Sequence, residues 1–106
     1  MEHRRAQRFT LHLPLSVVRS GAGQPALAGQ TNDISTVGVL FTTDQEPALS
    51  GPIEYVIALR PGEKRPLQLR CMGKVVRLEQ PANGHSQGSR SYRVAATLER
   101  YEFVRA

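Results

Sequence analysis

Apolar side chains recur mainly at every second position along this chain, and this period constrains the fold class more than any other feature. The alternation is clearest over residues 9–18, 53–59 and 92–98. A period of two is typical of half-buried strands, whereas helices repeat about every 3.6 residues. Turn-forming residues divide the chain into six such segments, at residues 9–18, 26–34, 37–43, 53–59, 67–78 and 92–98. Short strands with tight turns predict an all-β fold, a six-stranded antiparallel β-barrel of the split-barrel or Greek-key type with little helix.

The length of 106 residues fits one domain. We expect a flexible arginine-rich arm at residues 1–8, the barrel at 9–98 and a tail at 99–106 that forms either a helical turn or a strand. No apolar run approaches the roughly 20 residues needed to cross a bilayer, and the charged start does not read as a signal peptide. These features predict a cytoplasmic chain without membrane contact.

The inward faces of the strands predict the core. The first strand points Phe9, Leu11, Leu13, Leu15 and Val17 inward. In the fifth strand the inward set changes from Leu67, Leu69 and Cys71 to Val76 and Leu78, which predicts a β-bulge at Gly73. The aromatic residues mostly fall on inward positions; they are Phe9, Phe41, Tyr55, Tyr92, Tyr101 and Phe103.

Catalytic and metal-binding chemistry is not indicated. His3, His12 and His85 share no metal-ligand spacing, and no nucleophile-elbow, P-loop or zinc-protease motif is present. Cys71 is the only cysteine, so neither an internal disulfide nor a multi-cysteine metal site can form. Its inward position indicates a packed, inert thiol. We therefore predict that the chain is not an enzyme and needs no cofactor.

The charge favours an anionic partner. Lysine and arginine number 14 against 9 acidic residues, a formal net charge of +5. Twelve of the basic residues are arginines, whose planar fork binds phosphate and the guanine edge bidentately. Codon usage in a GC-rich genome explains the arginine excess equally well.

Two short motifs carry the binding hypothesis. One is Arg4-Arg5-Ala6-Gln7-Arg8, an Arg-x-x-x-Arg that by itself is no more than a solvated basic tail. The other is Asp33-Ile34-Ser35-Thr36-Val37-Gly38, an Asp-x-Ser-x-x-Gly turn. Seen alone, it also fits a plain turn in which Asp and Ser cap amides and Gly adopts a positive φ.

A hairpin between the first two strands would join these motifs. A turn near Ala22 places residue 9 opposite residue 35, so Arg8 arrives beside Asp33 and Ser35. Arginine forks bind phosphate and the guanine O6/N7 edge, and a carboxylate accepts from the N1 and N2 donors of guanine. A guanine nucleotide would satisfy both halves of this arrangement.

At these residues the sequence resembles the PilZ domain family, whose members carry both motifs in this order and at about this spacing. Gly73-Lys74-Val75-Val76-Arg77 is similar to a later strand of the family, and Tyr92-Arg93-Val94 resembles the start of its closing strand. The resemblance covers roughly residues 3–103. This chain departs from the family in having Ala95-Ala96 where many members have Gly-Val, and in its short C-terminal tail, which leaves the dimer mode and the output surface open.

The resemblance implies a non-catalytic bacterial second-messenger receptor whose arginine arm closes over cyclic di-GMP. Arg4 and Arg8 would take phosphates and guanine, with Arg5 as a helper. Asp33 and Ser35 would read guanine, Gly38 would permit the turn, and Arg77 stands where some members stack on the ligand. The expected partners are cyclic di-GMP and a downstream protein, with a homodimer left open.

Two alternatives remain at this point. Small basic barrels also bind single-stranded nucleic acid by stacking bases on exposed aromatic rings, but the inward positions of the aromatic residues leave few such platforms. The other is a PilZ-like interaction domain without nucleotide binding, against which the intact motifs argue.

Overall fold

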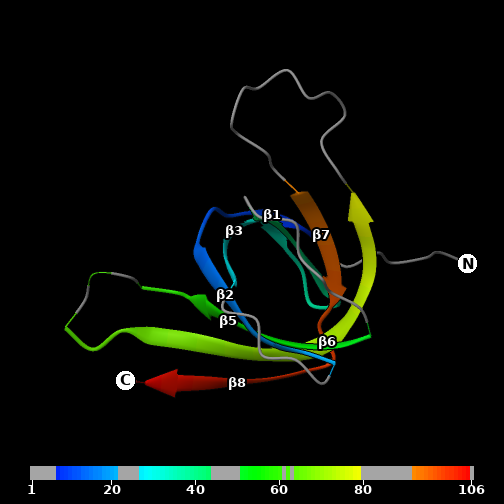
Figure 1. Ribbon diagram of the computed structural model, residues 1–106. Coiled ribbons are helices and arrows are strands. Elements are labelled where there is room, and N and C mark those ends of the chain that lie inside the picture. The colour runs from blue at the N-terminus through cyan, green and yellow to red at the C-terminus, as the bar shows by residue number, and fades with distance from the viewer. Residues whose placement is uncertain are drawn as a thin grey trace, which may run out of the picture.

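The chain folds into a closed antiparallel β-barrel of six strands with two additional strands (Figure 1). The computed structural model describes residues 7–21, 27–43, 51–60, 62, 64–79 and 92–105. Within them no helix occurs, and the strands are β1 (Phe9–Thr10), β2 (Pro14–Ser20), β3 (Leu27–Ile34), β4 (Gly38–Thr43), β5 (Pro52–Ala58), β6 (Leu67–Glu79), β7 (Tyr92–Thr97) and β8 (Arg100–Arg105). The barrel order is β3-β2-β5-β6-β7-β4, and pairing of β4 with β3 closes it. The predicted fold class is confirmed.

The first predicted strand is divided, because a buried threonine draws the chain out of the ladder. The Thr31 hydroxyl accepts from the Leu13 amide at 2.8 Å and donates to the Leu11 carbonyl. Residues 11–13 therefore separate β1 from β2, although both pair with β3. Phe9 and Leu11 are 53% and 44% exposed, so the prediction that they point into the core is wrong.

The core fills the barrel interior with the alternating residues of the other strands. Its largest fully buried side chains are Tyr55 and Phe41, whose rings lie 6.0 Å apart. The Tyr55 hydroxyl donates to the Thr97 carbonyl at 3.0 Å, which satisfies the one polar atom of that ring. Cys71 packs in the core as predicted, and burial raises the pKa of its thiol to about 12.

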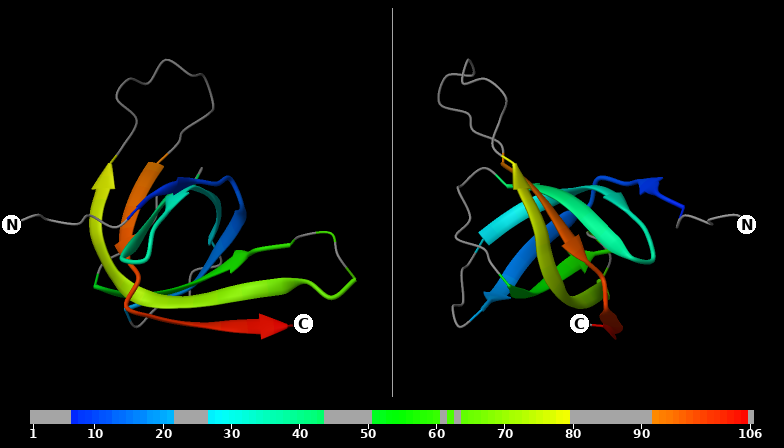
Figure 2. Two further views of the ribbon diagram at one scale, coloured as in Figure 1. Left: turned by 180° about the vertical axis from the view of Figure 1, so that it is seen from behind. Right: turned by 90° about the vertical axis from the view of Figure 1, so that its right-hand side faces the viewer.

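The long strand β6 links the barrel to a sheet extension. Its first half lies between β5 and β8, and its second half pairs with β7 (Figure 2). The predicted bulge at Gly73 is wrong, because the register shifts between Val75 and Arg77. Gly73 instead lies so close to β7 that any Cβ there would collide with the Thr97 carbonyl. Val76, predicted to point inward, is 64% exposed. Leu78 lies on the inner face as predicted, since it pairs with the buried Val94, but it remains 39% exposed.

The C-terminal tail is a strand and not a helical turn. Strand β8 pairs antiparallel with the first half of β6, from Arg100 opposite Met72 to Arg105 opposite Leu67. Tyr101 and Phe103 are exposed there, so the prediction that the aromatic residues are mostly internal holds only for Phe41, Tyr55 and Tyr92. The described residues include no helix long and apolar enough to cross a membrane.

Candidate functional site

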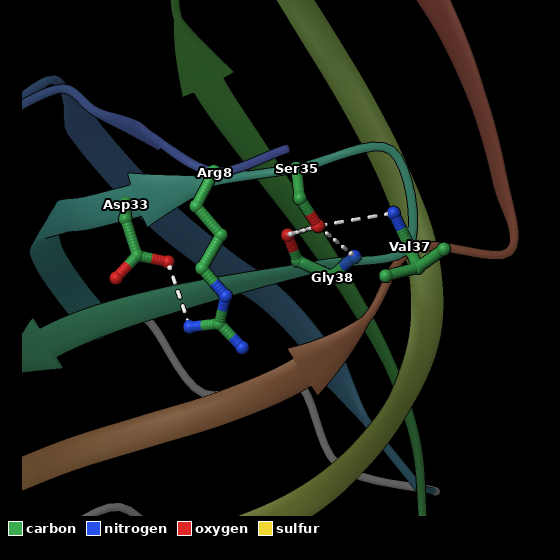
Figure 3. A network of polar contacts seen from close by, with 5 residues as sticks. All are labelled: Arg8, Asp33, Ser35, Val37 and Gly38. Atoms are coloured by element: carbon green, nitrogen blue, oxygen red, sulfur yellow. Dashed lines mark hydrogen bonds and ion pairs between the residues drawn. The ribbon is translucent and has the colours of Figure 1, made fainter. Parts of the chain in front are cut away.

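The hairpin of β2 and β3 brings Arg8 to the turn motif. Leu15 pairs with Gly29 in the predicted register, but in β1 Phe9 pairs with Ile34 and not with residue 35. The one-residue difference arises at residues 11–13, where the chain leaves the ladder. Arg8 nevertheless reaches Asp33, with its Nη1 at 3.4 Å from the Asp33 Oδ1 (Figure 3). Arg4 and Arg5 lie outside the described residues.

The serine of the turn motif closes the β3–β4 turn. Its Oγ accepts from the Val37 and Gly38 amides, each at 3.2 Å, and donates to the Gly38 carbonyl at 3.3 Å (Figure 3). A hydroxyl has one donor and two acceptor sites, so these contacts use the whole hydrogen-bonding capacity of Ser35. Ser35 is 8% exposed. Contact with a ligand would require it to release one of these partners.

The glycine of the turn motif is required by packing. Gly38 is not among the glycines with positive φ, so the conformational reason expected for it is wrong. An added Cβ at this position would lie 2.9 Å from the Ala96 carbonyl oxygen. Gly38 thus lets the start of β4 approach β7 closely, which brings the turn next to the strand that continues the site.

A row of paired residues joins Asp33 to Arg77 across four strands. Asp33 pairs with Leu40, Leu40 with Ala95, and Ala95 with Arg77. Directly opposite residues in a sheet share a face. Val39 and Phe41, the neighbours of Leu40, are buried, so the row lies on the outside of the barrel.

Two β-bulges turn the charged ends of this row outward. The fully buried Thr31 pairs with Phe41, and the register then shifts, so Asp33 lies on the outer face although it is only two positions further. In β6, Val75 pairs with the buried Ala96 before the shift that places Arg77 outside. Residues two apart share a face in a regular strand. The two bulges therefore point the Asp33 and Arg77 side chains outward, and bulges often redirect side chains in this way beside functional sites.

A cavity of about 220 Å³ lies over this row. Its charged lining is Arg8, Asp33 and Arg77, and the Ser35–Gly38 turn forms one wall. The remaining lining is mainly apolar: Val37, Val39, Leu40, Val76, Ala95 and Ala96, with Thr97. The site thus combines two guanidinium groups and one carboxylate with an apolar floor.

A second cavity of about 90 Å³ extends the site along β6 and β7. It shares Leu40, Arg77 and Ala95 with the larger cavity and adds Glu79 and Arg93. Arg77 Nε lies 3.5 Å from the Glu79 Oε2, and both side chains are well exposed. The combined surface offers arginines to an elongated anion with flat, apolar faces.

Candidate metal ligands do not gather in the described part of the chain. It holds no group of three or more His, Cys, Asp or Glu side chains that could bind a metal ion. His12 is exposed, with its Nδ1 at 3.3 Å from the Thr31 carbonyl, and it does not line the cavity. His3 and His85 lie outside the described residues.

The sequence motifs identified only part of this site. Leu40 and Ala95 form its floor, and Thr31 fixes the segment between β1 and β2, yet none of the three belongs to a motif. The Ala95-Ala96 pair, seen in the sequence as a departure from the family, was the one available signal for a floor of small residues. The change of phase in the apolar pattern of β6 signalled a bulge but placed it at Gly73, because its position at Val76 depends on the pairing of β6 with β7.

Comparison with known proteins identifies the family of the chain. The family model described as PilZ domain matches residues 2–101. Neither curated proteins nor solved structures give a match.

Proposed function

Because the chain belongs to the PilZ domain family, a family of cyclic di-GMP-binding domains, we propose that it is a non-catalytic cyclic di-GMP receptor module. The proposed ligand site consists of Arg4, Arg5 and Arg8 from the arm, the Asp33–Gly38 turn and Arg77. Because the ligand is an intracellular bacterial messenger, the proposed place of action is the cytoplasm.

The observation that carries this proposal is the outer row from Asp33 to Arg77 with Arg8 beside it. Cyclic di-GMP has two phosphates and two guanines, and the row supplies a partner for each kind of group. Asp33 accepts from the N1 and N2 donors of one guanine. Arg8 and Arg77 bind phosphate or the guanine O6/N7 edge, and their flat guanidinium groups stack on the base. Leu40 and Ala95 provide an apolar surface beneath it.

The ion pair of Arg8 with Asp33 is suited to exchange on binding. Its Nη1–Oδ1 distance is 3.4 Å and the Arg8 side chain is 69% exposed. Exposed pairs of this kind contribute only about 0–1 kcal/mol. Arg8 can therefore leave the carboxylate for a phosphate at little cost, and the freed Asp33 then accepts from guanine.

Closure of the arm sets the number of arginines that must bind. Ordering the backbone of residues 4–8 costs roughly 1–2 kcal/mol for each residue. Charge-assisted hydrogen bonds contribute about 1.5–3 kcal/mol each. At least two arginines of the arm must therefore engage the ligand. The closed arm would then form the surface that a downstream protein recognises.

Within the turn, we assign Asp33 and Ser35 different shares of ligand recognition. Asp33 has acceptor capacity beyond its contact to Arg8, so it accepts hydrogen bonds from guanine directly. Ser35 holds the Val37 and Gly38 amides and so keeps the turn in the shape that the ligand meets. Ser35 therefore contributes to guanine recognition mainly by holding the shape of the turn.

Isothermal titration calorimetry of the full chain tests the proposal. Cyclic di-GMP should bind with a saturable heat, while GTP and cyclic GMP should neither bind comparably nor compete at equal concentration. Absence of cyclic di-GMP binding by folded protein would refute the proposal.

Single-stranded nucleic acid is the second candidate, and one observation favours it. Phe9, Tyr101 and Phe103 are exposed, so the chain has more stacking surface than its sequence indicated. None of the three rings lines the basic cavity, however. Tight oligonucleotide binding with a steep salt dependence, in the absence of cyclic di-GMP binding, would select this candidate.

A further inference from the structure

The last strand of the sheet extension has one edge without a partner among the described residues. Among the residues that the structure describes, strand β8 pairs only with β6, and its other edge is open over Arg100–Arg105 (Figure 1). An open edge presents unpaired backbone N–H and C=O groups, which can pair with another strand. Proteins usually protect such edges with prolines, bulges or inward-pointing charges. Strand β8 has no proline, and its pairing with β6 is regular from end to end; the one charge on its core face is Arg105, at the very end of the strand opposite Leu67.

The core face of β8 carries two exposed aromatic rings. Tyr101 lies opposite Cys71 and Phe103 opposite Leu69, so both rings continue rows of the barrel core. They are 59% and 63% exposed and pack edge to face, with centroids 6.1 Å apart. This apolar face is therefore left uncovered where the sheet ends.

The opposite face carries a ladder of alternating charges that stops at the open edge. Arg19 contacts Glu54 at 3.7 Å, Glu54 contacts Arg70 at 2.5 Å, and Arg70 contacts Glu102 at 3.9 Å. Glu102 is 60% exposed and ends the ladder. An arginine on a strand added at this edge would continue the alternation of positive and negative charges. Arg100 is such an arginine, because it lies in β8 two positions before Glu102 and on the same face of the strand.

From these features we propose that β8 pairs antiparallel with β8 of a second copy of this chain, about a two-fold axis at Glu102. Tyr101 then lies opposite the Phe103 of the other copy, and the reverse pair forms by symmetry. Aromatic pairs across strands are favourable. On the other face, each Glu102 has the Arg100 of the second copy as its diagonal neighbour, in addition to its own Arg70. The aromatic face is thus complementary to itself, as an isologous contact requires. On the charged face the two Glu102 carboxylates lie directly opposite each other, which opposes pairing, and the Arg70 of each copy together with the diagonal Arg100 offsets this repulsion.

The open length of the edge favours this register over the one with its axis at Tyr101. An axis at Tyr101 would run the second strand toward residues 97–99, where the Leu98 amide already donates to the Val37 carbonyl. The axis at Glu102 keeps the pairing within Arg100–Val104, where the edge is open. The site for the second copy is separate from the cyclic di-GMP cavity, so this inference does not depend on the proposed function.

Sedimentation velocity on the full chain over a range of concentrations tests the pairing. The wild type should form a dimer, and Phe103→Lys should remain monomeric at concentrations where the wild type is dimeric. Val18→Lys introduces the same charge at an exposed apolar residue of β2 and should leave the dimer intact. Far-UV circular dichroism and thermal melting verify that both variants are folded.

Oxidative cross-linking tests the register. In Glu102→Cys the two new cysteines lie directly opposite each other, with Cα atoms about 4.5–5.5 Å apart, within the roughly 4.4–6.8 Å that a disulfide spans between Cα atoms, so a covalent dimer should form. In Val104→Cys the thiols are separated by several residues along the strands and should not cross-link. The wild type controls for Cys71, which is buried.

Three results would overturn the proposal. One is a wild-type chain that stays monomeric up to its solubility limit, and another is a dimer that Phe103→Lys does not weaken. The third is cross-linking through Val104→Cys without cross-linking through Glu102→Cys. A monomeric wild type whose oligonucleotide binding is lost in Phe103→Lys would assign the aromatic face to single-stranded nucleic acid instead.

Discussion

Asp33 and Arg77 lie at the two ends of one row of paired residues on the outside of the barrel, separated only by Leu40 and Ala95. A β-bulge precedes each of these two residues in its strand. Without the bulge, the regular alternation of the strand would point the side chain inward; with it, the side chain points outward. The carboxylate and the guanidinium group therefore face one cavity, although they belong to strands far apart in the sequence.

Replacing the carboxylate should weaken ligand binding without a matching loss of stability. Asp33→Ala removes the acceptor proposed for the N1 and N2 donors of guanine. We expect at least about tenfold weaker cyclic di-GMP binding, since a hydrogen bond with a charged partner contributes about 1.5–3 kcal/mol and tenfold equals about 1.4 kcal/mol. Calorimetry measures the affinity. His12→Ala is the control and should bind as the wild type does; equal affinity of both variants would rule out the site.

The arm arginine should matter for binding and very little for folding. Arg8→Ala breaks only an exposed ion pair, so the free energy of unfolding in urea should change by less than about 1 kcal/mol. Cyclic di-GMP affinity should fall at least about tenfold, in line with the loss of a charge-assisted hydrogen bond. Arg8→Lys should recover only part of it, because lysine lacks the planar fork. Full recovery by lysine would show that charge alone is needed.

The far end of the row gives a separate prediction. Arg77→Ala removes the cation that borders both cavities, and we expect cyclic di-GMP affinity to fall by roughly threefold to tenfold, since Glu79 already shares this guanidinium group. Arg19→Ala removes an arginine that lines neither of these cavities and should leave affinity unchanged. If the two variants bind alike, Arg77 does not belong to the site.

Replacing the serine of the turn should lower both the stability of the fold and the affinity for cyclic di-GMP. Ser35→Ala leaves the Val37 and Gly38 amides without their side-chain acceptor, at a cost of about 1–3 kcal/mol. Urea unfolding should show this loss, and calorimetry should show weaker binding because the turn relaxes. Thr36→Ala, an exposed neighbour in the same turn, is the control. Loss of affinity with stability unchanged would instead indicate that the Ser35 hydroxyl contacts the ligand directly.

The buried thiol makes the fold sensitive to alkaline pH. Burial raises the pKa of Cys71 from its ordinary value of 9.0 to about 12. Between these values the unfolded chain loses the proton and the folded chain keeps it, so the free energy of unfolding falls as pH rises. Burial also raises the pKa of Tyr55, which adds a loss of the same sign. Urea unfolding from about pH 8 to about pH 11 should therefore show falling stability.

The share of the thiol in this pH dependence is measured by Cys71→Ala. This variant is less stable at neutral pH because it leaves a cavity. Its stability should nevertheless fall less steeply with pH than that of the wild type. Parallel profiles for the two proteins would mean that the thiol does not contribute.

Local patterns in the sequence determined the class of fold and half of the site. Alternation identified the barrel strands to within a few residues, because one face of a strand in a barrel wall is buried whatever its partners are. The contact of Arg8 with Asp33 also follows from sequence, because a hairpin joins neighbouring strands and its turn sets the register to within one residue at β1. The family motifs at Asp33, Ser35 and Gly38 marked the same turn.

The tertiary structure alone decided which side chains are covered and where the ladder is interrupted. Phe9, Tyr101 and Phe103 alternate like core residues but lie where strands extend past the barrel, so no second layer covers them. The bulges before Asp33 and Arg77, and the close approach of Gly73 to Thr97, arise from pairing between strands that are distant in the chain. An alternating pattern reports which side of a strand is apolar. Only the position of the other strands determines whether that side is buried.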